Sequence, residues 1–124
     1  MITYLLPSCD NTFKYFFDLV YKIYKCNKKA LIIFQEEENM HFINENLWKF
    51  RNFLPHGLAN EAYAQDQPIL LTLDKIANFD VHIYFQHTAK EYDNVQNILW
   101  NPTPDEAKGK IWKLTNSQWV LKST

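Results

Sequence analysis

Residues 13–34 read FKYFFDLVYKIYKCNKKALIIF, and this stretch decides the fold class of the protein. Its first half repeats large apolar side chains at helical spacing, among them Phe16 and Val20, while lysines line the opposite side. A polar turn at 27–29 interrupts this pattern. The run Ala30–Phe34 that follows is short, apolar and partly β-branched, which is typical of a buried strand. A helix that leads directly into a buried strand predicts an α/β protein.

The flanking segments continue the alternation of helices and strands. We expect a strand at 2–7, a helix from Glu36 to Phe50, strands at 68–73 and 81–85, helices at 88–100 and 104–114, and an edge strand at 118–122. Thr103-Pro104-Asp105-Glu106 has the pattern of a capping box and predicts the start of the last helix. Residues 51–67 read as irregular. The chain is therefore expected to form a single Rossmann-like α/β domain over residues 1–124. Its mainly parallel central sheet should carry helices on both faces.

Length and composition indicate a soluble protein of the reducing cytoplasm. The chain has 124 residues, 47% hydrophobic, and only two cysteines, so a single core can form without disulfides. We expect no membrane contact, because no apolar run approaches the ~20 residues that cross a bilayer. The formal charge of -1 is laid out unevenly, since the sequence is basic at both ends and acidic between them. A near-neutral total argues against unaided, tight binding to duplex DNA.

The sequence offers no recognisable active site. Its two glycines, Gly57 and Gly109, lie outside the first strand-to-helix turn, so neither a dinucleotide fingerprint nor a P-loop can form there. Cys9 is a possible nucleophile after the first strand, but no base stands at a recognisable spacing. The glutamates at 36–38 read as charges that complement a helix N-terminus, and the four histidines lack metal-ligand spacing. We expect no catalytic residue, no metal and no cofactor.

The most distinctive stretch is residues 47–61, LWKFRNFLPHGLANE, which places large apolar groups at a helix end and in a loop. Trp48, Phe53, Leu54 and Pro55 either plug the base of the sheet or form an exposed patch of the kind that marks an interface. Composition alone favours plugging, because large apolar side chains are more often buried than exposed.

At this point the chain resembles the chi subunit family of bacterial DNA polymerase III, an accessory protein of the clamp loader. The resemblance rests on Leu47-Trp48, on Phe53-Leu54-Pro55-His56 with Leu58, Ala59 and Glu61, on Thr3-Tyr4-Leu5-Leu6, and on the predicted strand Pro68-Ile69-Leu70-Leu71-Thr72. It covers residues 1 to about 86 well, whereas the last third is shorter than in familiar members and aligns loosely.

The resemblance implies a non-catalytic protein with two partners. Trp48, Phe53, Leu54 and Pro55 would dock a psi-like subunit that ties the protein to the clamp loader. A basic C-terminal helix would hold the acidic, Phe-terminated tail of single-stranded DNA-binding protein. In this chain that helix would carry Lys108, Lys110, Trp112 and Lys113, although Gly109 weakens the helical pattern. Without the resemblance, these lysines read as a solvated face at a helix C-terminus.

The sequence therefore predicts a replication accessory module that contacts DNA only indirectly and works by binding at two separated sites. Two other functions stay open. One is a small α/β enzyme, either a hydrolase or a nucleotide-dependent protein. The other is a module that binds single-stranded DNA directly through Tyr, Trp and Lys side chains.

Overall fold

The structure is a computed structural model. It describes residues 2–7, 12–49, 55–59, 66–76, 78–86, 93–100, 110–115 and 118–122, with the backbone alone at 2–7, 12–13, 110–115 and 118–122. No helix in these ranges is long and apolar enough to cross a membrane.

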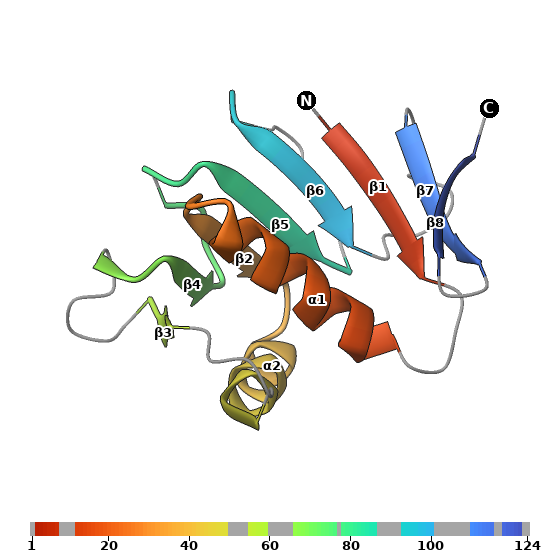
Figure 1. The fold of residues 1–124 in the computed structure, drawn as a ribbon. Helices are drawn as coiled ribbons and strands as arrows, with labels where there is room; N and C mark the ends of the chain where they lie inside the picture. The colour runs from red at the N-terminus through yellow and green to blue at the C-terminus, as the bar shows by residue number, and fades with distance from the viewer. Residues whose placement is uncertain are drawn as a thin grey trace.

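Two helices and eight strands are present in the described residues, and the strands form one sheet (Figure 1). The elements are β1 (Ile2–Pro7), α1 (Thr12–Lys25), β2 (Ala30–Phe34), α2 (Glu37–Lys49), β3 (His56–Leu58), β4 (Ile69–Thr72), β5 (Val81–Phe85), β6 (Gln96–Trp100), β7 (Lys110–Thr115) and β8 (Gln118–Lys122). The strand order is β3-β4-β2-β5-β6-β1-β7-β8, and every neighbouring pair is parallel except the antiparallel β7 and β8. This is the mainly parallel, Rossmann-like α/β fold expected from the sequence.

The first half of the chain follows the sequence prediction closely. The helices expected after the first two strands are α1 and α2, and the apolar runs at 2–7, 30–34, 68–73 and 81–85 form β1, β2, β4 and β5. The edge strand expected at 118–122 is β8, at one end of the sheet. A three-residue strand, β3, lies in the segment that we expected to be irregular.

The helix predicted at 88–100 is wrong where the structure describes it. Residues 96–100 form β6, which pairs with β5 on one side and β1 on the other. Its apolar run Ile98-Leu99-Trp100 is too short for its period to separate a strand from a buried helix turn. All three side chains are buried, and the ladders on both sides satisfy the backbone of a strand at this position. Residues 88–92 lie outside the described ranges.

The helix predicted at 104–114 is also wrong over its second half. Residues 110–115 form β7, whose register pairs Trp112 with Leu5 of β1 and with Leu121 of β8. Tertiary pairing on both sides favours a strand at 110–115. The helix start signal at 103–106 lies outside the described residues. Gly109 is a poor helix residue that directly precedes β7, and it was the local sign that a helix does not continue.

The core of the described residues lies on both faces of the sheet. On one face α1 and α2 pack against the strands, and Phe16 of α1 meets Phe85 and Trp100 edge-on at ring-centroid distances of 5.2 and 5.1 Å. On the other face, Leu31, Leu70 and Leu99 form a second cluster with Phe79 and Tyr84, against which Ala59 and Ile76 pack. A helix over this second face would fall outside the described residues.

Candidate partner-binding surfaces

Trp48 lies near the C-terminal end of α2 and is 61% exposed. Its ring centroid is 4.3 Å from that of His56, a buried side chain of β3, and the two rings are tilted by 45°. The helix buries Met40, Ile43 and Leu47 against the sheet. Because successive helix residues are turned by about 100°, the residue that directly follows Leu47 leaves this buried stripe. Trp48 is therefore not buried at the base of the sheet. Composition had favoured that buried position.

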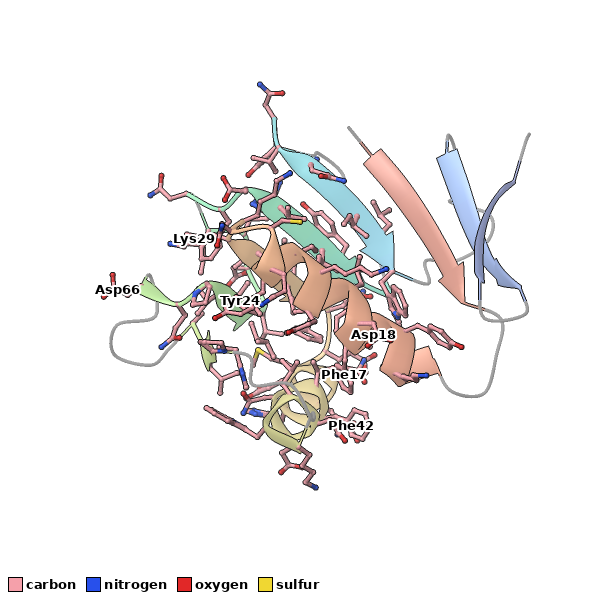
Figure 2. All side chains as sticks on the ribbon, viewed as in Figure 1. Phe17, Asp18, Tyr24, Lys29, Phe42 and Asp66 are labelled. Carbon is pink, nitrogen blue, oxygen red and sulfur yellow. The ribbon has the colours of Figure 1, made fainter. Side chains whose placement is uncertain are left out.

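Two other large hydrophobic side chains are exposed among the described residues, and both are close to α2. Phe42 lies on α2 itself and is 45% exposed (Figure 2). Leu73 directly follows β4, is 41% exposed, and lines a pocket together with Met40 of α2. Phe42, Trp48 and Leu73, which we call the α2 apolar residues, are thus the exposed large hydrophobic groups of the described chain. Phe42 and Trp48 are six residues apart and so lie about 120° apart around α2, and exposed apolar side chains of this kind are found at protein interfaces.

The other residues of the first predicted site are placed only in part. Pro55 is half-buried and immediately precedes β3, so it is next in sequence to the His56 ring that Trp48 contacts. Phe53 and Leu54 lie outside the described residues. The structure therefore brings Trp48 to the start of β3, next to the Pro55-His56 part of the motif.

The second predicted site has a different backbone from the one we expected. Lys110, Trp112 and Lys113 lie on β7, between β1 and β8, and Lys108 lies outside the described residues. Residues three apart, such as Lys110 and Lys113, share a face on a helix but belong to opposite faces of a strand. Lys110 and Lys113 belong to β7, which pairs antiparallel with the edge strand β8, so a basic helix over 110–114 is excluded.

A pocket of about 240 Å³ lies at the carboxyl end of β4, where open α/β sheets commonly hold ligands. Glu37 and Asp74 line it together with the apolar Met40, Leu71 and Leu73. The Thr72 hydroxyl donates to the carbonyl of Asp74 at 2.9 Å and accepts from the Asp74 amide at 3.1 Å, so it serves the local turn. Among the described residues, no three His, Cys, Asp or Glu side chains gather where they could hold a metal ion. This pocket points to no particular reaction.

A buried histidine lies on the second face of the sheet. His82 of β5 is 2% exposed, and its Nδ1 lies 3.9 Å from a carboxylate oxygen of Asp93. Burial lowers the pKa of His82 below its usual 6.5, the Lys75 ammonium lowers it further, and the Asp93 carboxylate opposes this only in part. Lys75 itself pairs with Asp93 at 3.4 Å. His82 is therefore mainly neutral at physiological pH, consistent with a structural residue.

Sequence reasoning missed Phe42 and Leu73. A signal for Phe42 was present, because it falls between the buried positions 40 and 43 and outside the apolar stripe of α2. Leu73 carried no such signal, since it ends an apolar run that reads as wholly buried. Its exposure depends on where β4 stops, at Thr72.

A family model described as DNA polymerase III chi subunit, HolC, matches residues 3–111. The match includes α2, β3 and the start of β7, whereas Trp112 and Lys113 lie beyond its end. No curated protein sequence matches the chain.

Proposed function

The chain belongs to the DNA polymerase III chi subunit family, a replication accessory, and from this membership we propose that it links the clamp loader to coated single-stranded DNA. One contact joins a psi-like clamp-loader subunit, and a second holds the acidic tail of single-stranded DNA-binding protein. Two modest contacts on one module raise the effective concentration of one partner near the other without any covalent step.

The exposure of Trp48 is the observation that carries this proposal. A tryptophan that is 61% exposed leaves much apolar surface in water, and a protein partner would remove that surface. Its ring packs beside the buried ring of His56, and a contact that restricts an exposed side chain lowers the entropy lost on docking. Phe42 on the same helix and Leu73 beside it are further exposed apolar side chains. The psi-like subunit is therefore assigned to the α2 apolar residues together with Phe53, Leu54 and Pro55.

The tail site is assigned to the basic C-terminal segment that holds Lys108, Lys110, Trp112 and Lys113. Residues 108–124 contain four lysines and no acidic residue, so the segment attracts a carboxylate-rich peptide. Because residues 110–115 form β7, the tail would meet this segment along a strand.

A direct binding measurement tests both contacts. Isothermal titration with a purified psi-like subunit should give a 1:1 complex that the variant Trp48→Ala weakens strongly. A synthetic acidic peptide ending in Phe should bind with micromolar-scale affinity and weaken as salt rises. It should also lose binding when its last Phe is removed. Absence of any binding by this peptide at low salt would refute the tail contact, and a psi-like subunit that binds the Trp48 variant unchanged would refute the first assignment.

A further inference from the structure

The end of α1 carries a concentrated positive charge. Residues 22–29 contain four lysines and no acidic residue, and the first three of these lysines are exposed. Within the described part of the chain, neither Lys22 nor Lys28 forms an ion pair. The ammonium group of Lys29 lies 4.8 Å from the centre of the Phe79 ring. This group of charges belongs to neither of the two surfaces described above.

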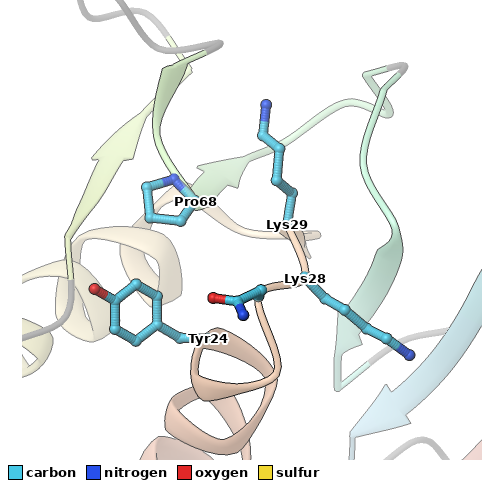
Figure 3. A pocket seen from close by; sticks show the side chains of 5 residues that line it. Tyr24, Lys28, Lys29 and Pro68 are labelled. Atoms are coloured by element: carbon cyan, nitrogen blue, oxygen red, sulfur yellow. The ribbon is translucent and has the colours of Figure 1, made fainter.

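Two pockets open on either side of this turn. The first has a volume of about 220 Å³, and its lining combines the aliphatic Leu19, Ile23, Val81 and Ile98 with Lys22, Cys26, Lys28 and Gln96. The second, of about 210 Å³, is lined by Tyr24, Asn27, Lys28, Lys29 and Pro68 (Figure 3). Lys28 lines both, and none of the described residues that line them is acidic. We call these two the α1 terminal pockets. Together their linings contain aliphatic side chains and three lysines.

The backbone around these pockets is fixed by hydrogen bonds. Asn27 has a φ of 59°, its amide donates to the carbonyl of Tyr24 at 3.0 Å, and the amide of Lys28 donates to the carbonyl of Ile23 at 3.4 Å. This is the Schellman arrangement of a helix C-terminus. The amide of Lys29 then donates to the Asp80 carboxylate at 2.8 Å, and the amide of Asp80 donates to the carbonyl of Lys29 at 2.9 Å. The turn is thus held in place before any ligand arrives, which favours binding.

The size and lining of the pockets select the class of ligand. Each is smaller than the roughly 300–1,000 Å³ that is usual for small-molecule and cofactor sites, so each suits a single side chain of a larger ligand. Among the described residues, the first pocket is lined by aliphatic and not by aromatic side chains, which suits a large apolar side chain better than a stacked nucleic-acid base. Tyr24 is the aromatic side chain of the second pocket. The ammonium groups of Lys22 and Lys28, which line the first pocket, attract carboxylates.

We propose that the α1 terminal pockets bind an acidic peptide segment of a partner protein, with one large apolar side chain inserted between α1 and the first residues of β5 and β6. Carboxylates on either side of that side chain meet Lys22 and Lys28. This site is separate from the psi-like and tail contacts. It lies at the edge of the sheet where β5 and β6 begin, opposite to the edge where α/β enzymes hold substrates.

The test uses the full chain and a fluorescein-labelled peptide in which one internal Phe is flanked by Asp and Glu, with an amidated C-terminus. Fluorescence anisotropy should detect binding at low salt, and Lys28→Glu should weaken it about tenfold or more, because Lys28 lines both pockets. Lys25→Glu is a close control, since Lys25 is in the same cluster but lines neither pocket. It should change the affinity less than about threefold. Lys14→Glu, at the other end of α1, should leave binding unchanged.

Cys26 gives a second, site-specific readout because its exposed thiol lines the first pocket. Bound peptide should slow alkylation of Cys26, as peptide mapping by mass spectrometry would show, and the same peptide with Ala in place of Phe should not. The double variant Lys110→Glu/Lys113→Glu should bind the amidated peptide normally. The proposal is overturned if Lys14→Glu, Lys25→Glu and Lys28→Glu weaken binding equally, if Cys26 is not protected, or if a single-stranded oligonucleotide protects Cys26 and the peptide does not.

Discussion

The ring of Trp48 lies 4.3 Å, centroid to centroid, from the ring of His56, yet Trp48 is 61% exposed whereas His56 is 4% exposed. An exposed indole is thus held against a buried ring on the short strand β3. Trp48 therefore presents apolar surface to solvent, and the core depends little on its side chain.

Replacing Trp48 by Ala should therefore affect binding far more than folding. We expect the affinity for a psi-like partner to fall by about 2 kcal/mol or more, as for a central interface aromatic. The free energy of unfolding should change by less than about 1 kcal/mol, because most of the side chain is already in solvent. Isothermal titration and urea unfolding measure the two effects.

The neighbouring residue supplies a matched control. Leu47 is 2% exposed in the core, so Leu47→Ala should cost about 2–5 kcal/mol of stability. If Trp48→Ala destabilised the protein as much as Leu47→Ala, the indole would be a structural group and its assignment to an interface would be wrong.

Trp100 should behave in the opposite way to Trp48. It is fully buried on β6 and packs edge-on against Phe16 of α1 at 5.1 Å, so the helix and the sheet meet at this ring. Trp100→Ala should lower the free energy of unfolding by about 3–5 kcal/mol, since it leaves a large cavity. Thermal and urea unfolding should show the loss, and a decrease below 1 kcal/mol would contradict the packing described for β6.

Stability should fall as the pH drops below the usual pKa of His82. Its folded-state pKa is lowered, so the unfolded chain binds more protons in this range and the free energy of unfolding decreases with decreasing pH. The loss should begin near pH 6.5, the usual value for histidine, and continue until the folded protein also takes up the proton. Urea unfolding at pH 7.5, 6.5 and 5.5 would measure the slope.

His82→Gln should reduce this slope, because the buried proton acceptor is removed. His41→Gln is the control: His41 is exposed on α2 beside Glu37, and its loss should leave the contribution of His82 in place. An unchanged slope in His82→Gln would show that another group causes the pH dependence.

The turn after α1 should depend on the residue at position 27. Asn27 has a φ of 59°, a conformation that costs most residues with a Cβ atom about 1–2 kcal/mol. Asn27→Ala should therefore destabilise the protein by about 1 kcal/mol, whereas Asn27→Gly should keep its stability within a few tenths of a kcal/mol. Equal losses in both variants would mean that the Asn27 side chain contributes more than its tolerance of this backbone conformation.

The amino-acid sequence by itself determined the α/β class and most of the first half of the fold. The apolar stripe of α1 and the run Ala30–Phe34 each have a clear period and a clear end, and these local signals agree with the final packing. The motif around Trp48 and Pro55 also sufficed to indicate the family that the comparison confirmed.

Only the tertiary structure decided the secondary structure of the last third of the chain and the exposure of the surface residues. Ile98-Leu99-Trp100 and residues 110–115 form strands because β5, β1 and β8 offer backbone partners from distant parts of the chain, and no local pattern records those partners. Whether an aromatic side chain is buried depends in the same way on what packs against it. Trp48 and Trp100 are the same amino acid, one exposed and one buried, because α2 turns the first away from the core while β6 lies inside the sheet beneath α1.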